Sequence, residues 1–180
     1  MTGFWDAERR QTLRTIARGL CLGALGVAGF YLQPLSLQYN ISSSEPIGLY
    51  LLNQWASPGP GDMIVFRYHS DIDDALYQSQ ALQKRLIKRV AAVEGSVINT
   101  EGRCHTLDGQ PVGCVPEISE GGTKIEHFVS YQQFTMPRGS YYVRGIDTPG
   151  QGTSFDSRFF GLVYASQVLG QTWLLWEFKS

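Results

Sequence analysis

Cysteine, histidine and lysine, which build many functional sites, are scarce in this 180-residue sequence. The three cysteines and three histidines follow no metal-ligand spacing, so we expect neither a metal site nor a cofactor. The net charge is −1 and no broad basic patch is present, which gives no electrostatic reason to expect a nucleic-acid partner. Internal repeats are also absent. The length suits one domain of ordinary size with an appendage.

The appendage is an apolar N-terminal segment with an asymmetric charge pattern. Four arginines between positions 9 and 18 precede an uncharged stretch, Gly19 to Tyr39. Because arginines before an apolar segment stay in the cytoplasm, the following residues are placed outside. Spanning a bilayer takes roughly 20 residues. We therefore predict a cytoplasmic N-terminus (residues 1–14), a transmembrane anchor (15–35) with Arg18 snorkelling, and a periplasmic domain (36–180) on the inner membrane.

Two alternatives to the anchor remain open at this point. A cleaved signal peptide would use the weak small-residue site at Gly26 to Ala28. A buried helix of a soluble protein would also be apolar. Cys21 lies in this segment and is interpreted as a packing residue.

A cluster of three serines, Ser42 to Ser44, follows the apolar segment and precedes Glu45-Pro-Ile-Gly48. An ordinary turn accounts for such a composition. A nucleophilic serine just outside a bilayer would instead suit an enzyme that cuts proteins at their membrane anchors. That serine would need a base. The histidines do not suggest one, because they are scattered and expected to be exposed: His69, His105 and His127.

Lysine is the alternative base, and the sequence has only four lysines. Lys88 lies within Leu86 to Val93, the best strand pattern in the chain. With a period of two, Lys88 shares a face with apolar residues while Arg89 points the other way. Such a face would desolvate the amine and lower its pKa. An edge position with the amine in water is the alternative. The other three lysines lie in polar or terminal surroundings: Lys84, Lys124 and Lys179.

Beyond the anchor the sequence is mainly β, in short runs punctuated by Gly, Pro and Asp. This spacing predicts a β-sandwich or barrel domain after one N-terminal transmembrane helix. A weak helical pattern covers residues 71–84. Residues 173–178 are interpreted either as a final strand or as a membrane-interface segment. The predicted strands are 47–52, 63–68, 86–93, 96–100, 140–143 and 162–168, with Tyr141 and Tyr142 in the core.

One polar segment, residues 102–131, is interpreted as an insertion with a hairpin. Cys104 and Cys114 flank Asp108-Gly109, a strong hairpin-turn signal. A hairpin can bring the two cysteines into disulfide range, and an oxidising compartment would close the bond. Two unpaired cysteines are the alternative.

Four segments resemble, in order, the conserved boxes of type I signal peptidases of the serine–lysine, S26 type. They are Asn40 to Tyr50, Gly61 to Phe66, Ile87 to Val90 and Ser154 to Val163. The first box is most similar to the conjugative-transfer branch, the TraF-like peptidases, whose pattern is Asn-x-Ser/Thr-x-Ser-x-Pro-x-Gly-x-Tyr. A single box would be weak evidence, whereas four in order are strong.

The resemblance implies a role for each site residue. Ser44 would be the nucleophile and Lys88 the general base. The Ser44 N–H and the Ser42 hydroxyl would form the oxyanion hole. Ser154 would orient the lysine amine. An ion pair would shape the loop beneath it: Asp156 with Arg158.

The sequence departs from the family at three places. Cellular signal peptidases have two residues between nucleophile and proline, and on that spacing Ser43 would be the nucleophile; the conjugative pattern selects Ser44. The residues after the lysine box, Ala92 to Ser96, lack the usual Gly-x-Pro-Gly-Asp. The usual Gly-Asp-Asn appears as Gly145-Ile-Asp147. The last two differences bear on substrate preference more than on mechanism.

The resemblance implies a membrane-anchored serine endopeptidase that processes signal sequences or pilin precursors of a conjugative or type IV secretion system. Its partners would be a membrane-inserted preprotein or pilin precursor and membrane lipid. Pilin cyclisation, which some members of the branch perform, uses the same residues. A housekeeping signal peptidase, a cytosolic self-cleaving repressor-type protease and an inactive structural subunit of the apparatus are the alternatives.

Overall fold

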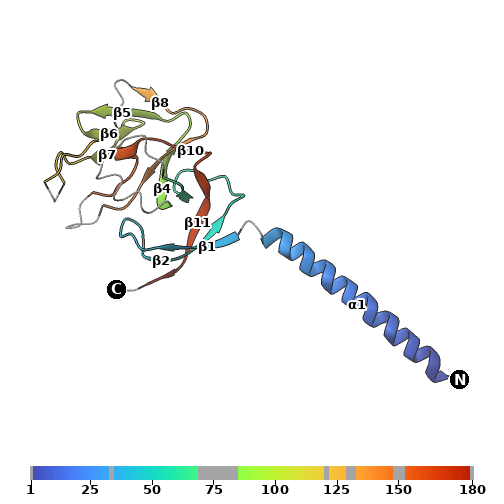
Figure 1. Ribbon diagram of the computed structural model, residues 1–180. Helices are drawn as coiled ribbons and strands as arrows, with labels where there is room; N and C mark the ends of the chain where they lie inside the picture. Colours follow the sequence, from blue (N-terminus) through green and yellow to red (C-terminus); the bar gives the residue numbers. More distant parts are fainter. Residues whose placement is uncertain are drawn as a thin grey trace. The chain divides into compact units, whose positions relative to one another are not determined.

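The computed structural model describes residues 2–32, 35–68, 85–119, 122–128, 133–147 and 153–178 (Figure 1). The chain divides into two units, Met1–Ser36 and Leu37–Ser180. The first unit is helical and the second is built mainly from β-strands. The expected fold class, a mainly β domain after an apolar N-terminal helix, is therefore confirmed.

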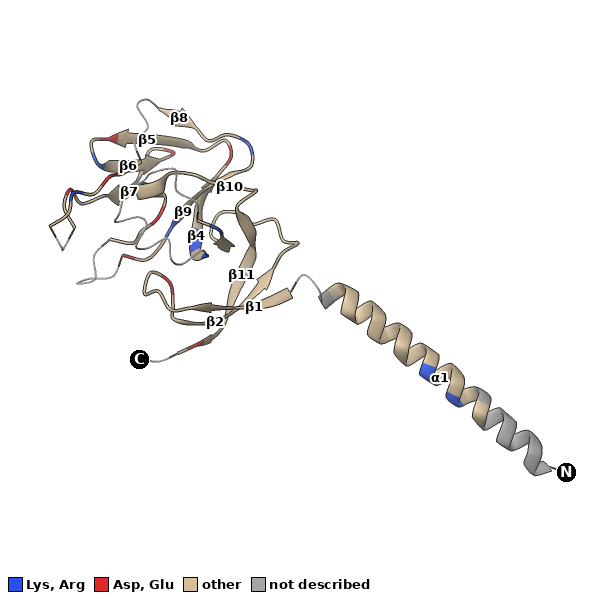
Figure 2. Ribbon diagram, viewed as in Figure 1, with Lys and Arg blue, Asp and Glu red and all other residues tan. Residues whose placement is uncertain are grey.

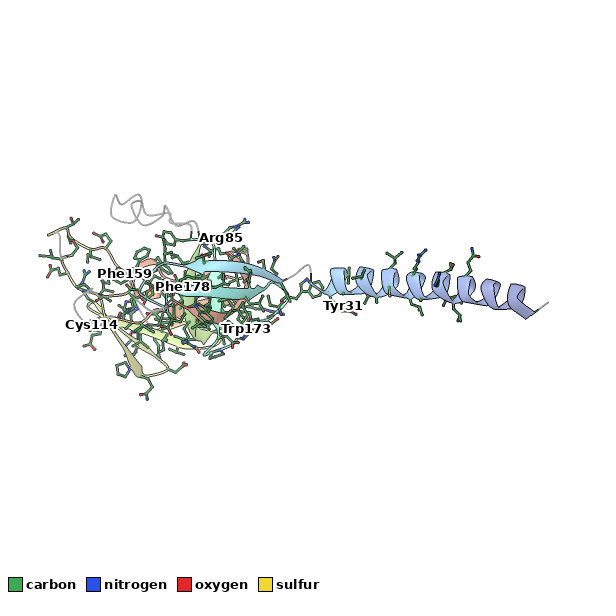
Figure 3. The ribbon with its side chains drawn as sticks, turned by 90° about the horizontal axis from the view of Figure 1, so that it is seen from below. Tyr31, Arg85, Cys114, Phe159, Trp173 and Phe178 are labelled. Carbon is green, nitrogen blue, oxygen red and sulfur yellow. A yellow bond between two sulfur atoms is a disulfide. The ribbon has the colours of Figure 1, made fainter. Side chains whose placement is uncertain are left out.

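Helix α1 (Thr2–Leu32) contains a stretch, Leu13–Tyr31, that is long and apolar enough to cross a membrane, with a mean hydropathy of 1.3. Its described side chains are exposed and project outward in Figure 3. In Figure 2 the blue bands on the helix lie near its middle, and the part between them and the β domain is mainly tan. The exposed apolar surface is what a lipid-facing helix requires.

Two expectations for this segment need correction. Leu35 already belongs to strand β1, so the helix does not extend to the expected end of the anchor. A proline disfavours helical backbone at the residue before it, which accounts for the end of helix α1 at Leu32, two residues before Pro34. Cys21 is exposed instead of packed.

The domain contains a seven-stranded and a four-stranded antiparallel sheet within the described residues. The first sheet has the order β1-β2-β11-β3-β4-β9-β10. Its strands are β1 (Leu35–Asn40), β2 (Gly48–Asn53), β3 (Met63–Phe66), β4 (Leu86–Val93), β9 (Ser140–Arg144), β10 (Val163–Tyr164) and β11 (Val168–Glu177).

Strand β11 joins two parts of this sheet that are otherwise separate. It pairs with β2 from Gln171↔Asn53 to Glu177↔Gly48 and with β3 from Val168↔Phe66 to Thr172↔Met63. Strand β3 then pairs with β4, with Ile64 opposite Lys88. The segment predicted either as a final strand or as an interface segment is thus a strand, although several of its side chains remain exposed, including Trp173 and Trp176.

The second sheet has the order β7-β6-β5-β8 and contains the predicted hairpin. A disulfide joins Cys104 and Cys114, which lie opposite each other in the β6–β7 pair. Asp108 and Gly109 form the turn with positive φ values of 49° and 78°. The strands are β5 (Val97–Glu101), β6 (Cys104–Leu107), β7 (Gln110–Cys114) and β8 (Phe134–Thr135).

The strand predictions succeeded where apolar and polar residues alternate. Strand β4 has the predicted bounds, and Arg89 is exposed while Lys88 and Val90 are buried. The predicted strand 162–168 is wrong as a single element, because a turn separates β10 from β11. In that turn the Gln167 N–H donates to the Tyr164 carbonyl at 2.8 Å. The predicted helix 71–84 lies outside the described residues.

His105 was expected to be exposed, but only 1% of it is accessible. It alternates along β6 with exposed and half-buried neighbours, so its ring faces the interior. The ring Nδ1 and the Tyr142 hydroxyl share a hydrogen bond of 2.8 Å. Burial lowers the pKa of His105 to about 4, so the ring is neutral at physiological pH. His127 is half-buried, and His69 lies outside the described residues.

Candidate active site

The serine loop, residues 41–47, connects β1 to β2 and is held by neutral hydrogen bonds. The Asn40 side-chain amide donates to the carbonyls of Ser42, Glu45 and Pro46, each at 3.0 Å. Its Oδ1 accepts the Ser42 N–H at 3.1 Å. The buried Tyr50 hydroxyl also donates to the Pro46 carbonyl, at 2.7 Å. Burial raises the pKa of Tyr50 to about 12, so this donor stays protonated.

Gly48 closes the loop at the start of β2. A Cβ atom at this position would lie 2.1 Å from the Trp176 carbonyl oxygen of β11. Only glycine therefore permits the approach of β11 that fixes the end of the loop. The Asn, Gly and Tyr positions of the serine box thus each have a mechanical role in shaping this loop.

Within the loop, Ser44 is buried and Ser43 is exposed. The Ser42 and Ser44 Oγ atoms lie 3.0 Å apart, and the Ser44 N–H points at Ser42 Oγ at 3.4 Å. The backbone amide of Ser44 and the hydroxyl of Ser42 are therefore neighbours on one side of the Ser44 side chain. Two such donors can stabilise negative charge that develops on a carbonyl oxygen attacked by Ser44.

Lys88 brings its amine to Ser44 from strand β4. Its Nζ donates to Ser44 Oγ and, at 2.9 Å, to Ser154 Oγ. Only 3% of Lys88 is exposed. Among the described residues, the hydrogen-bond partners of this amine are therefore two uncharged hydroxyls.

This setting changes the acidity of the lysine. Burial lowers the pKa of Lys88 from 10.5 to about 8, and the charges of Asp156 and Glu45 only partly oppose that effect. At pH 7 about a tenth of the amine is then neutral and able to accept a proton. An amine with the unperturbed pKa of 10.5 would be neutral in about one molecule in three thousand.

Gly145, at the end of β9, makes room for this arrangement. A Cβ atom there would lie 2.1 Å from Ser154 Oγ, 2.8 Å from Lys88 Nζ and 3.0 Å from Ser44 Cβ. The next residue, Ile146, donates its backbone N–H to the Ser44 carbonyl at 2.7 Å. The β9 end therefore contacts the nucleophile loop and the lysine at the same point.

An ionic cluster, buried except for Asp147, which is 42% exposed, supports the backbone of Ser154. It consists of Asp147, Asp156 and Arg158. Arg158 is 1% exposed and Asp156 is fully buried. The guanidinium donates to Asp156 Oδ1 at 2.9 Å and Oδ2 at 2.8 Å, and to Asp147 at 3.0 and 2.7 Å. Asp147 in turn accepts the Ser154 N–H at 2.9 Å. The predicted Asp156–Arg158 ion pair is present, and it belongs to a larger cluster that includes Asp147.

Asp156 also begins the short helix α3 (Ser157–Phe160) as its N-cap. Its side chain accepts the N–H of Arg158 at 3.1 Å and that of Gly145 at 3.2 Å. One carboxylate therefore links α3 to the β9 end. Burial acts to raise the pKa of Asp147, but the hydrogen bonds from Arg158 and the Ser154 N–H, together with the charges of Arg158 and Arg144, hold it below its usual value.

The disulfide hairpin lies against this cluster. Arg144 donates to the carbonyl of Val112 on β7, and a Cβ atom at Gly113 would lie 3.0 Å from Arg158 Nη1. Arg144 also lies 3.2 Å from Asp147. The segment interpreted as an insertion therefore packs against the residues that support Ser154. Cys114, labelled in Figure 3, follows Gly113.

Sequence reasoning identified the residues that meet here, but it did not assign a role to Asp147, Gly145 or Asn40. The signal for Asp147 was its carboxylate in the altered Gly-Ile-Asp segment, which was noted only as a departure. Its contact with Arg158 joins residues 11 positions apart in the sequence. The structure brings together Ser42, Ser44, Lys88, Ser154, Asp156 and Arg158, while Cys104 and Cys114 form the nearby disulfide.

Comparison with known proteins identifies the family of the chain. The family described as "Signal peptidase, peptidase S26" matches residues 9–177. No curated protein matches the sequence. Among solved structures, a signal peptidase I from Enterococcus faecalis V583 is 23% identical, with 64% of this chain and 97% of that chain covered and a TM-score of 0.35.

The family match extends over most of the chain, from the apolar helix to strand β11. The chain belongs to the peptidase S26 family of signal peptidases. It is thus a serine endopeptidase of the signal peptidase type, a class whose substrates are preproteins, and its N-terminal apolar helix suits membrane anchoring.

Proposed function

We propose that the protein is a membrane-anchored Ser44–Lys88 endopeptidase of the conjugative-transfer branch that processes signal sequences or pilin precursors of a type IV secretion system. The observation that carries the proposal is the contact of the Lys88 amine with the buried Ser44 hydroxyl. The serine box supports the assignment to the conjugative-transfer branch. A single residue separates Ser44 from Pro46, and the loop is held by hydrogen bonds from Asn40 and Tyr50.

The reaction begins when neutral Lys88 takes the proton of Ser44 Oγ as that oxygen attacks the scissile carbonyl carbon. The carbonyl oxygen becomes negative and is stabilised by the Ser44 N–H and the Ser42 hydroxyl. The Lys88 ammonium then gives its proton to the leaving nitrogen, the C–N bond breaks, and an acyl-enzyme on Ser44 remains. Ser154 keeps the amine directed at Ser44 through both transfers.

The acyl-enzyme can be resolved in two ways with the same residues. Water attacks the ester carbon and gives a proton to Lys88; the bond from that carbon to Ser44 Oγ then breaks, Ser44 Oγ takes the proton back from Lys88, and a linear product is released. An amine at the other end of the substrate can attack the ester instead and displace Ser44, which forms an amide. The cyclic product is then one water lighter than the linear product. The catalytic domain would lie on the periplasmic side of the inner membrane, where the disulfide between Cys104 and Cys114 is favoured.

Membrane anchoring would help this chemistry. A substrate held in the same bilayer presents its scissile bond at a nearly fixed height. Confining both partners to one surface also raises their effective concentration. The helix that contains Leu13–Tyr31 would supply this confinement.

The experiment is an assay of pilin-precursor processing by the wild type and by Ser44→Ala, with Ser43→Ala as the matched control. We expect Ser44→Ala to abolish processing and Ser43→Ala, at an exposed position, to retain it. The reverse result would transfer the nucleophile to Ser43. Mass spectrometry of the product distinguishes hydrolysis from cyclisation by the loss of one water. Cleavage of a preprotein with an Ala-x-Ala site but not of any pilin precursor would favour a general signal peptidase.

A further inference from the structure

A buried carboxyl group adjoins the nucleophile and has no place in the chemistry described above. Glu45 follows Ser44 in the serine loop, and only 1% of its side chain is exposed. Within the described part of the chain, neither carboxylate oxygen of Glu45 accepts a hydrogen bond. Burying such a group without a hydrogen-bond partner is costly, so its presence beside the nucleophile requires an explanation.

The position of Glu45 is fixed by its backbone. Its carbonyl accepts the Asn40 amide at 3.0 Å, and the adjacent Pro46 carbonyl accepts both Asn40 and Tyr50. The backbone that carries this side chain is therefore held by the same hydrogen bonds that shape the loop presenting Ser44. Because its oxygens are inaccessible, direct contact with a substrate is also excluded in this conformation.

The charged neighbours of Glu45 come from strand β4. Arg89 Nη2 lies 3.8 Å from Glu45 Oε2, too far for a hydrogen bond but close enough for charge attraction, and the arginine side chain is half exposed. Lys88, the preceding residue, also acts on Glu45 through its charge. The third titratable neighbour is Tyr50, whose ionisation Glu45 opposes.

We propose that Glu45 is a positioning residue for the dyad whose negative charge sets the pH at which Lys88 becomes a base. The inference rests on the proposed Ser44–Lys88 chemistry and extends it. The carboxylate of Glu45 stabilises the ammonium form of Lys88 and thereby limits the fraction of neutral amine that can activate Ser44.

The balance of charges around Lys88 supports this role. Burial lowers the pKa of Lys88, Asp156 opposes that effect most, and Glu45 opposes it next; Arg158 lowers the pKa and Asp147 raises it. Asp156 is already neutralised by Arg158 through two hydrogen bonds and lies near Arg144 as well. Glu45 has no comparable partner, so its charge is the less compensated of the two.

The coupling is reciprocal. Burial raises the pKa of Glu45, while the charges of Arg89 and Lys88 lower it. When Lys88 loses its proton, Glu45 loses one of the two charges that favour its ionised form. The two groups must therefore titrate as a linked pair.

The test uses the scarcity of lysine in this chain. Full-length protein in detergent micelles, labelled with 13C at lysine Cε, contains only four labelled side chains, and Lys88→Arg assigns the relevant resonance. In Glu45→Gln we expect the pKa of Lys88 to fall by about half a unit to one unit, at the low end of the effect of one nearby charge. Glu101→Gln, which removes an exposed carboxylate from β5, is the matched control and should leave that pKa unchanged.

Cleavage kinetics give the functional readout. The probe is a fluorogenic peptide that spans the Ala-x-Ala site of a secretory signal peptide. The wild-type kcat/KM should rise with pH, and the midpoint of this rise should lie near the Lys88 pKa of about 8. Glu45→Gln should move that midpoint to lower pH and raise kcat/KM severalfold one unit below it, whereas Glu45→Asp, which keeps the charge, should restore a midpoint nearer to wild type.

An unchanged or raised Lys88 pKa in folded Glu45→Gln would overturn the inference. Should that variant fail to fold, the wild type decides: a 13C label at Glu45 Cδ must show an inflection at the pH where Lys88 titrates, and its absence is equally decisive. Cleavage that survives Ser44→Ala, or Lys88→Ala, would contradict the proposed function instead. The NMR titration of Lys88 still tests Glu45 in that case.

Discussion

The Lys88 amine lies between two regions that keep their shapes by different means. On one side, the serine loop is held by amide and hydroxyl hydrogen bonds from Asn40 and Tyr50. On the other side, Asp156 and Arg158 are buried members of an ionic cluster. Only hydroxyl groups from these two regions, those of Ser44 and Ser154, contact the amine among the described residues.

The difference between the two regions shows where charged groups can lie without preventing Lys88 from acting as a base. A carboxylate bonded directly to the amine would stabilise its ammonium form and raise its pKa. Here the carboxylates of the cluster are paired with Arg158, and Ser154 stands between the cluster and Lys88. The ionic region can therefore be rigid without bonding directly to the Lys88 amine and stabilising its ammonium form. Glu45 is the one acidic residue of the neutral region, which is why its charge has a separate effect.

The largest effect is expected from removing the amine itself. Lys88→Met should reduce cleavage on the order of a thousandfold or more, because Ser44 loses its base. The same change should stabilise the fold at pH 7, since a buried ammonium is lost. Burial lowers the pKa of Lys88 from 10.5 to about 8, so wild-type stability rises with pH across that interval and the advantage of the variant shrinks there.

Denaturant unfolding at pH 7 and at pH 10 measures this difference. Ser44→Ala is the control, because it should lose cleavage without removing a buried charge. A Lys88→Met protein that is less stable than wild type at pH 7 would contradict a desolvated lysine.

Gly145→Ala tests the junction of the two regions. The added Cβ would overlap Ser154 Oγ and crowd Lys88 Nζ, so the amine must move away from Ser44. We expect kcat to fall on the order of a hundredfold, since small misplacements of reacting groups have effects of this size. Gly59→Ala, whose Cβ would have its nearest contact at 4.0 Å, is the matched control. Equal kcat values for the two variants would show that the close contact is not needed.

Arg158→Met breaks the ionic region alone. It leaves the buried carboxylate of Asp156 without its main partner, which should lower the free energy of unfolding by about 3–5 kcal/mol. Arg138→Met, at an exposed position, should change it little. Thermal or denaturant unfolding provides the measurement. A loss below about 1 kcal/mol, the range of surface ion pairs, would mean that the cluster adds no more than such a pair.

Tyr50→Phe makes the smallest change, in the neutral region. It removes one donor to the Pro46 carbonyl but leaves the Asn40 donor in place. We expect a loss of about 0.5–1.5 kcal/mol in unfolding free energy and only a modest decrease in kcat. Tyr164→Phe, at a side chain that is 49% exposed, is the control. A larger effect than that of Arg158→Met would reverse the ranking of the two regions.

The sequence could predict the neutral region better than the ionic one. The serine loop and the burial of Lys88 follow from local patterns, namely a short motif and the alternation in β4. The role of Asp147 depends on its contact with Arg158, 11 positions later in the sequence, which no local pattern encodes. His105 was misjudged for a similar reason, because a polar strand becomes buried only when the second sheet packs on Tyr142. The break between β10 and β11 falls at Ala165 to Gln167, where two polar residues interrupt an otherwise apolar segment that was interpreted as one strand.

The central place of β11 in the first sheet has a consequence for the timing of activity. During synthesis β11 is made after every other strand of that sheet, yet it connects the strand that follows Ser44 to the strands that carry Lys88. Long-range pairings of this kind form only when both partners have left the ribosome. Sheet pairing therefore cannot link the strand that follows Ser44 to the strand that carries Lys88 until translation has passed Glu177, long after the apolar helix could have reached the membrane.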